Sequence, residues 1–232
     1  MIRLAQTVYD SEGFRLAADF EIARHSFSAV LGPSGAGKST LLSLIAGFLP
    51  LTLGHVIIDG VETDGVPPAA RPVSMIFQDH NAFAHLDSWT NVALGISPSL
   101  DLAENDRAAV DEALARVGLS ALARKRPGEM SGGEVQRIAL ARALVRQKPI
   151  LLLDEPFAAL DPGLRQQMLA LVNELHQERR LTTLMVTHEP KDARAVADQV
   201  IFIDGGEARP PAPTGRFFSG KQDKAVSRYL GT

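Results

Sequence analysis

The sequence contains no cysteine among its 232 residues. This absence excludes disulfides, cysteine-ligated zinc and catalysis by a thiol, and it is compatible with a reducing compartment. Basic residues are also not in excess, because 24 Lys and Arg face 27 Asp and Glu for a net charge of −3. Proteins that bind nucleic-acid backbones are usually basic, so we expect no nucleic-acid partner. Hydrophobic residues at 45% indicate a folded globular chain.

Long apolar runs are missing as well. The stretch 39–58 carries no Asp, Glu, Lys or Arg and comes nearest to a membrane span. It contains Gly47, Pro50 and Gly54, which divide it into pieces shorter than the roughly 20 apolar residues that a spanning helix requires. The pattern favours a buried helix, a turn and a strand. Residues 1–10 lack the apolar run of a signal peptide, so the sequence predicts a soluble protein.

The apolar residues indicate two kinds of β-strand. Residues 14–22 alternate between apolar and polar side chains, which is typical of a half-buried antiparallel strand. Later runs are short and almost entirely apolar, as in parallel strands that helices cover on both sides. These later runs are 27–31, 73–77, 150–153, 184–186 and 200–203.

Helical periodicity fills the intervals between these runs. Apolar residues recur at helical spacing within 41–49, 110–117 and 164–175. Strands that alternate with helices predict an α/β fold. A long middle stretch shows helices and little strand signal, so we expect it to form an inserted helical subdomain. The expected organisation is a single domain over 1–232, with a core of about 1–78 and 147–232 and a helical subdomain of about 79–146.

One motif lies between the run at 27–31 and the first predicted helix. Its glycines let backbone N–H groups turn inward around phosphate oxygens, and the positive end of the following helix faces the same anion. Lys38 is expected to reach the β- and γ-phosphates of a nucleotide, and the Ser39 hydroxyl to ligate Mg²⁺. The motif reads Gly32-Pro33-Ser34-Gly35-Ala36-Gly37-Lys38-Ser39, is followed by Thr40, and fits the P-loop pattern G-x-x-x-x-G-K-[ST].

A P-loop by itself predicts only a nucleoside triphosphate. GTPases, nucleoside kinases, helicases and transport ATPases all share it. The guanine-reading patterns N-K-x-D and T-K-x-D are absent, which disfavours a small GTPase. The alternative is a glycine-rich turn with an unrelated lysine, but the flanking strand and helix favour a nucleotide site.

Polar side chains end three of the apolar runs. Asp154 is suited to hold Mg²⁺, usually through water, and Glu155 to orient or deprotonate the attacking water. His188 could donate a hydrogen bond to a γ-phosphate oxygen, and the amide of Gln78 could touch the metal or the water. Taken singly, these residues have structural alternatives, namely a pair of solvated acids, a structural histidine and an ordinary glutamine.

A glycine pair precedes a further predicted helix. Ser131 and Glu134 flank the pair and fit the capping box S-x-x-E. A capped helix start with two glycines also exposes backbone N–H groups, which form an anion site. The structural and functional interpretations are therefore compatible. The complete run is Met130-Ser131-Gly132-Gly133-Glu134.

At this point the chain resembles the ATP-binding cassette family. That family's signature, L-S-G-G-Q, appears here as M-S-G-G-E. Met130 is a mild apolar replacement, whereas Glu134 adds a carboxylate near the expected phosphate. We expect Glu134 to fold back onto the Ser131 backbone N–H, which limits its effect on ATP binding. The motifs follow the family's order: the P-loop, Gln78, the signature, Asp154-Glu155, Ala159-Leu160-Asp161 and His188.

The resemblance implies a P-loop NTPase core with a mainly parallel sheet, an N-terminal antiparallel β subdomain and an inserted helical subdomain. It implies ATP and Mg²⁺ as cofactors, with Asp161 and the signature residues near the nucleotide. In this family two chains form a homodimer, and the signature of one chain faces the γ-phosphate on the other. Adenine stacks on an aromatic side chain of the first strands. Tyr9 is the first candidate and Phe14 the second, with core packing as the alternative.

A single cassette without a membrane span resembles the separate ATPase subunit of an importer. Such a subunit sits peripherally on the cytoplasmic face of the inner membrane, binds integral membrane permease subunits and serves a periplasmic solute-binding protein indirectly. The residues most similar to the ATPase subunits of bacterial thiamine importers are 67–78, 81, 83–86, 95–100 and 181–186. Phe83, Leu86 and Trp89 are candidate contacts with the permease, or else they pack in their own lobe.

Other functions stay open from the sequence. The same ATPase could serve an importer of iron, sulfate or a polyamine. A soluble cassette ATPase that acts on DNA or ribosomes is disfavoured by the acidic composition. A P-loop kinase is disfavoured by the signature and by Glu155, because a carboxylate placed to activate water suits hydrolysis better than transfer.

Overall fold

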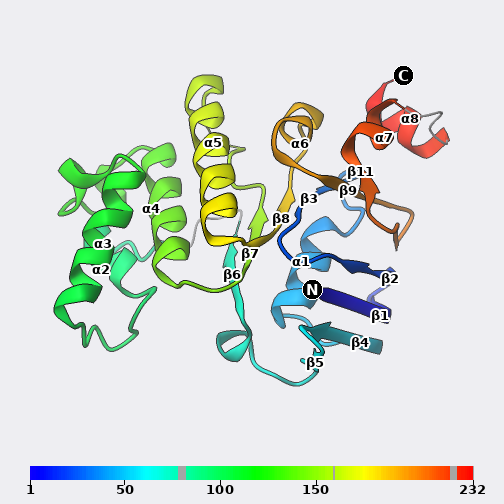
Figure 1. Cartoon of the computed structure of the whole chain (residues 1–232), viewed down its shortest axis with the longest axis horizontal. Helices are drawn as coiled ribbons and strands as arrows, with labels where there is room; N and C mark the ends of the chain where they lie inside the picture. The colour runs from blue at the N-terminus through cyan, green and yellow to red at the C-terminus, as the bar shows by residue number, and fades with distance from the viewer. Residues whose placement is uncertain (78–81, 159, 220–223, 232) are drawn as a thin grey trace.

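The computed structural model describes residues 1–77, 82–158, 160–219 and 224–231. Their strands form a single mixed sheet in the order β5-β4-β1-β2-β10-β9-β3-β8-β7-β6, and β11 pairs with β9. Figure 1 shows three helices, α2, α3 and α4, gathered at one end of the molecule and the carboxyl-terminal helices at the other. No helix in these ranges is both long and apolar enough to span a membrane.

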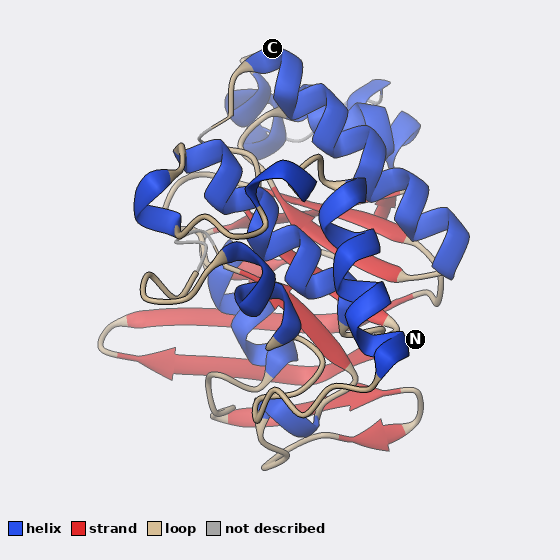
Figure 2. Ribbon diagram, turned by 90° about the vertical axis from the view of Figure 1, so that its left-hand side faces the viewer, coloured by secondary structure: helices blue, strands red, loops and turns tan. Residues whose placement is uncertain are grey.

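The first strands pair in antiparallel fashion, as residues 14–22 predicted. Leu16, Phe20 and Ile22 point into the core while alternate residues face outward. Figure 2 shows this antiparallel part at the lower side of the molecule, away from most of the helices. The strands are β1 (Ile2–Ser11), β2 (Phe14–Ile22), β4 (Leu53–Ile58) and β5 (Val61–Glu62).

The short apolar runs form the parallel part of the sheet, which confirms the second strand prediction. The pairs β3–β8, β3–β9, β6–β7 and β7–β8 are all parallel, and every residue of β3, β7 and β8 is buried. The carboxyl ends of parallel strands meet at one edge of the sheet, which is where ligands bind in this fold class. The strands are β3 (Phe27–Leu31), β6 (Val73–Ile76), β7 (Ile150–Asp154), β8 (Thr182–Val186), β9 (Gln199–Asp204), β10 (Glu207–Ala208) and β11 (Ala212–Pro213).

Helices connect these strands and confirm the predicted α/β class. The helix predicted near 41–49 is shorter than expected, because Gly47 adopts a left-handed conformation with φ of 84° and ends it. Phe48 therefore lies outside the helix, 49% exposed, rather than on its buried face. The helices are α1 (Lys38–Ala46), α2 (Ser88–Ala93), α3 (Glu104–Arg116), α4 (Gly132–Val145), α5 (Pro162–Arg179), α6 (Pro190–Val196), α7 (Thr214–Ser219) and α8 (Lys224–Leu230).

The helices α2, α3 and α4 pack against one another in the middle of the chain. Their apolar residues, such as Val92, Leu114 and Ile138, belong to the same buried cluster as Ile76 and Leu153 of the parallel sheet. The described residues between 82 and 146 contain no strand. Their core is therefore continuous with that of the sheet, and the subdomain boundaries at about 78 and 147 stay a prediction.

Candidate functional site

The turn between β3 and α1 requires glycine at two positions. Gly32 and Gly37 have φ values of 154° and 105°. A Cβ atom on Gly32 would lie 2.1 Å from the carbonyl oxygen of Ile203, and one on Gly37 would lie 2.9 Å from the Phe14 ring. No side chain fits at either place without moving backbone or an aromatic ring. The P-loop glycines therefore serve both conformation and close packing.

The start of α1 is open to an anion. Its N-cap residue is Gly37, which offers no side-chain hydrogen bond, and the first turn contains no acidic residue. The first backbone N–H groups of a helix have no partner within the helix and carry its positive partial charge. This helix start is therefore available for a phosphate.

The start of α1 opens into a hollow of about 480 Å³. P-loop residues line one side, and two residues that follow β7 and β8 line the other. The sequence predicted that these segments would meet, although more than 100 residues separate them in the chain. The lining residues are Phe14, Ser34, Gly35, Gly37, Lys38, Ser39, Thr40, Glu155 and His188.

Lys38 is almost fully buried, at 5% exposure. Its ammonium group donates hydrogen bonds to the carbonyl oxygens of Gly32 and Pro33, at 2.9 and 2.8 Å. Burial lowers the pKa of Lys38, while the nearby charges of Glu155 and Asp154 act in the opposite direction. The ammonium is thus held at the edge of the hollow by neutral carbonyls, which a phosphate could replace.

Ser39, the last residue of the P-loop motif, contacts Asp154, the last residue of β7. The Ser39 hydroxyl donates to Oδ1 of Asp154 at 2.9 Å, and Asp154 is only 5% exposed. Burial raises the pKa of the Asp154 carboxyl, and the Ser39 hydrogen bond partly offsets that effect. A hydroxyl and a buried carboxylate are the hard oxygen ligands that Mg²⁺ prefers. These donors therefore fit a magnesium ion.

Glu155 and His188 contact each other at the mouth of the hollow. His188 Nε2 donates to Oε1 of Glu155 at 2.6 Å, with the two side chains 45% and 15% exposed. Glu155 itself adopts a positive φ of 46°, which turns it away from the strand direction of β7. The sequence predicted separate roles for these residues and did not predict that they are partners.

The start of α4 carries its own carboxylate. Glu134 Oε2 accepts hydrogen bonds from the backbone N–H and the hydroxyl of Ser131, at 2.7 and 2.9 Å, while the Glu134 N–H donates back to the Ser131 hydroxyl. These bonds lower the pKa of Glu134. The expected fold-back of Glu134 onto Ser131 is therefore present in the structure. None of these residues lines the hollow of its own chain.

Comparisons with known proteins agree with this geometry. The family model described as ABC transporter matches residues 17–158, more than half of the chain. The chain belongs to the ABC transporter family. As a member of this family it is an ATP-binding ATPase.

Curated relatives match this ABC protein over nearly its whole length. It is 50% identical to the thiamine import ATP-binding protein ThiQ of Mesorhizobium japonicum, over 99% of this chain and 91% of the relative. It is 53% identical to the protein of the same name from Rhizobium meliloti, over 93% and 91%.

Solved ABC structures share the fold. A dimeric ATP-binding cassette in a post-hydrolysis state, bound to ADP and Pi, superposes with a TM-score of 0.82 at 29% identity, covering 92% of this chain and 99% of that one. CbiO1 of Clostridium perfringens, part of an ABC transporter complex, gives a TM-score of 0.83 at 28% identity, covering 99% and 94%.

Other predicted site residues of this ABC protein occupy different surroundings. Asp161 caps the start of α5, where Oδ1 accepts hydrogen bonds from the N–H groups of Gly163 and Leu164 at 3.1 and 3.0 Å. Gln78 and Ala159 lie outside the described residues. Asp161 is therefore placed at a helix start outside the lining of the hollow.

The aromatic candidates for adenine are neighbours on β1 and β2. The ring centroids of Tyr9 and Phe14 lie 6.4 Å apart. Both rings pack against the apolar cluster of the antiparallel strands, and of the two only Phe14 also lines the hollow. The structure therefore offers the second candidate, Phe14, to the nucleotide site, and it leaves the stacking role of either ring a prediction.

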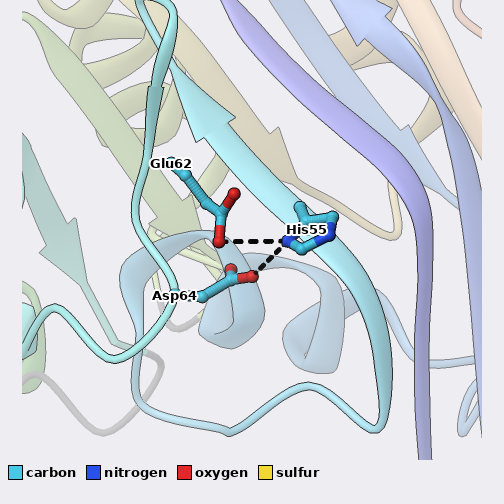
Figure 3. Close-up of side chains that lie close together, drawn as sticks. All are labelled: His55, Glu62 and Asp64. Atoms are coloured by element: carbon cyan, nitrogen blue, oxygen red, sulfur yellow. Dashed lines mark hydrogen bonds and ion pairs between the residues drawn. The ribbon is translucent and has the colours of Figure 1, made fainter.

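Sequence reasoning also missed polar groups near the site. Arg165 and Asp192 form an ion pair beside the loop that carries His188. No local motif identifies this pair, because its members lie on different helices. A second cluster consists of His55 on β4, Glu62 on β5 and Asp64, two residues after the end of β5 (Figure 3).

The second cluster is separate from the nucleotide site. His55 Nδ1 lies 2.8 Å from Asp64 Oδ2 and 3.2 Å from Glu62 Oε1. The hydrogen bond with Asp64 and the charge of Glu62 raise the pKa of His55. All three side chains are exposed, so their ion pairs add little to stability.

Proposed function

We propose that this chain is the ATPase subunit of a bacterial thiamine importer. The catalytic part of the proposal depends on one observation, the hollow lined by an uncapped helix start, Lys38, Glu155 and Ser39, whose hydroxyl binds Asp154. The thiamine part depends on relatives of about 50% identity that span nearly the whole chain and are named for thiamine import.

The proposed binding mode uses groups that are already in place. The backbone N–H groups at the start of α1 bind phosphate oxygens, and Lys38 exchanges its carbonyl partners for the β- and γ-phosphates. Ser39 and Asp154 would hold Mg²⁺, which would supply positive charge next to the phosphates. Gln78 is proposed as a further metal or water contact. Phe14 or Tyr9 stacks on adenine.

Glu155 is the proposed general base. It accepts a proton from the water that attacks the γ-phosphorus, while the bond to the leaving oxygen of ADP breaks. The hydrogen bond from His188 holds the Glu155 carboxylate at the mouth of the hollow. In the loaded site, His188 is placed to donate instead to a γ-phosphate oxygen, which couples the histidine to the state of the nucleotide.

A second copy of the chain completes the proposed site. Ser131 and Gly132 are exposed and do not line the hollow of their own chain, although their helix start is suited to an anion. In a homodimer this helix start reaches the γ-phosphate bound to the partner, and Asp161 lies near the same interface. Similarity to a dimeric ATP-binding cassette supports this arrangement.

A groove beside α4 is the proposed contact site for the membrane permease. It encloses about 490 Å³ between β6 and α4, and Phe83, which is 46% exposed, lies on its edge. Trp89 is less available, because it packs on the lobe core and its Nε1 donates to Asp111 at 2.7 Å. Docking of a permease here places the subunit on the cytoplasmic face of the membrane, with the periplasmic binding protein as an indirect partner.

Transport measurements test this function. The chain is co-produced with the membrane and binding proteins encoded beside it, and uptake of labelled thiamine is followed in membrane vesicles supplied with ATP. We expect uptake that the Lys38→Ala variant abolishes. Uptake of iron, sulfate or a polyamine in place of thiamine would overturn the cargo assignment, and uptake that survives Lys38→Ala would overturn the role of the P-loop.

A further inference from the structure

Arg165 connects two loops that border the nucleotide site. Its backbone N–H donates to the carbonyl oxygen of Asp161 at 2.9 Å, so it lies in the first turn of α5. Its guanidinium crosses to α6, where Nε donates to Oδ2 of Asp192 at 3.0 Å and Nη2 donates to the same oxygen. Asp192 is only 7% exposed. Removing one partner of such a pair leaves an uncompensated buried charge.

The Thr187 hydroxyl extends this ion pair to His188. It donates to Oδ2 of Asp192 at 3.1 Å and accepts from the N–H of Glu189 at 3.1 Å and from Nη2 of Arg165 at 3.5 Å. Thr187 is 4% exposed. The backbone on both sides of His188 is thus tied to the same hydroxyl, and the hydroxyl is tied to the ion pair.

These loops border a hollow that also touches the buried core, through Phe157 and Met185. This hollow of about 190 Å³ separates the segment after β7 from the segment after β8. Its lining includes Glu155, Phe157, Arg165, Thr187 and His188. Where a hollow separates two loops, the polar bonds that cross it help to fix their positions. The ion pair and the His188–Glu155 bond are side-chain links at this hollow, beside the backbone hydrogen bond from the Glu155 N–H to the Val186 carbonyl oxygen at 3.2 Å.

We propose that the Arg165–Asp192 pair is a positioning device for hydrolysis. It holds Thr187 and thereby fixes the backbone of His188 beside Glu155, and it transmits the placement of Asp161 at the start of α5 to that pair of residues. Arg165 and Asp192 do not touch the reacting atoms in this proposal. The inference rests on the proposed ATPase function, because it gives His188 and Glu155 their roles in hydrolysis.

A purely stabilising ion pair is the competing explanation, and the chain contains a matched control. Arg116 of α3 also binds α5, with Nη1 at 2.9 Å from Glu178 and Nη2 at 3.3 Å from Glu174. This second pair contacts none of the residues that line the hollows beside Glu155. Loss of either arginine therefore removes an anchor of α5, but only Arg165 reaches the loop of His188.

The test compares three variants of the full chain: Arg165→Met, the double variant Arg165→Met/Asp192→Leu, and the control Arg116→Met. We measure kcat, the Kd for ATP, the thermal midpoint, and hydrogen exchange of the Glu189 amide without nucleotide. Arg165→Met should lower kcat at least about tenfold, leave the Kd within about threefold, and speed amide exchange about tenfold or more. Arg116→Met should leave kcat, Kd and exchange within about twofold.

The double variant separates positioning from stability. Replacing both buried charges by apolar groups removes the penalty of a lone charge, so the thermal midpoint should return to that of the wild type. In our account kcat stays low and exchange of the Glu189 amide stays fast. Recovery of kcat in the double variant, or an effect of Arg165→Met no larger than that of Arg116→Met, would overturn the proposal.

Two further outcomes are informative. If Arg165→Met does not fold, kcat and the thermal midpoint of the double variant are compared with those of the wild type instead. If the wild-type chain hydrolyses no ATP, the proposed roles of Glu155 and His188 in hydrolysis fail, while the exchange measurement still tests the ion pair. Faster exchange of the Glu189 amide then supports its positioning role, and unchanged exchange contradicts it.

Discussion

Two helices of this chain begin with glycine-rich turns, and the two starts are built in opposite ways. The start of α1 has Gly37 as its N-cap, has no side-chain cap and opens into the hollow. The start of α4 has Ser131 as its N-cap and is closed by the reciprocal hydrogen bonds of Ser131 with Glu134. One start is open to a ligand of its own chain, whereas the other pairs the N–H groups of Ser131 and Glu134 through its capping box and faces outward.

One sequence can thus divide a binding site between two molecules. An uncapped helix start that lines a hollow binds an anion by itself. A capped and exposed helix start binds an anion only when a second molecule places the anion against it. The capping box also keeps the Glu134 carboxylate at Ser131, which limits its repulsion of a phosphate.

A single added methyl group at a glycine of each helix start distinguishes the two starts. Gly37→Ala places a Cβ 2.9 Å from the Phe14 ring at a positive φ, whereas Gly132→Ala places one in open space. We expect Gly37→Ala to weaken ATP binding at least about 100-fold and Gly132→Ala to change it less than about threefold. Titration calorimetry on the two variants measures this. Equal losses would show that both starts bind the nucleotide of the same chain.

The Glu155→Gln variant separates ATP binding from ATP hydrolysis. The amide cannot accept the proton of the attacking water, so kcat should fall by about 10³-fold while the Kd for ATP changes little. Phosphate release assays and nucleotide titration measure the two quantities. Hydrolysis within about tenfold of the wild type would assign the general base to another residue.

Glu134→Gln tests the closed start of α4. Glutamine keeps the capping acceptor and removes the charge, so the ATPase rate should change by less than about tenfold. Steady-state hydrolysis at saturating ATP measures it. A gain of about 100-fold would mean that the carboxylate reaches the phosphate and acts as a brake.

The smallest expected effect is the pH dependence of the same residue. Hydrogen bonds from Ser131 lower the pKa of Glu134 in the folded chain. The ionised form therefore adds stability above the pKa of an unfolded glutamate, near about 4.3, and this contribution disappears as the pH falls through the lower folded value. The difference in urea midpoint between wild type and Glu134→Gln should shrink from about pH 6 to about pH 3. A difference that grows with acidity would contradict this sign.

Local patterns allowed much of the fold to be predicted. The P-loop, the parallel strands and the capping box each lie within a few consecutive residues, so spacing reveals them. The predicted end of α1 lies too far along the chain, because Phe48 continues the apolar pattern. The left-handed Gly47 ends the helix before that residue. Backbone conformation at that glycine overrode the side-chain pattern.

Contacts between distant segments were beyond such patterns. The Glu155–His188 bond joins the ends of two strands, and the Arg165–Asp192 pair joins two helices. Both contacts depend on the alignment of the strands within the sheet. The choice between Tyr9 and Phe14 likewise depends on which ring reaches Gly37, and residue type cannot reveal that.

The central claim is that two chains share each nucleotide, and mixing two inactive variants tests it most directly. Lys38→Ala disables the P-loop and leaves the start of α4 intact, whereas Ser131→Arg does the reverse. Random pairing makes about half of the dimers mixed, each with one complete site, so the mixture should regain about a quarter of the wild-type hydrolysis. A mixture no more active than its separate components would contradict the shared site.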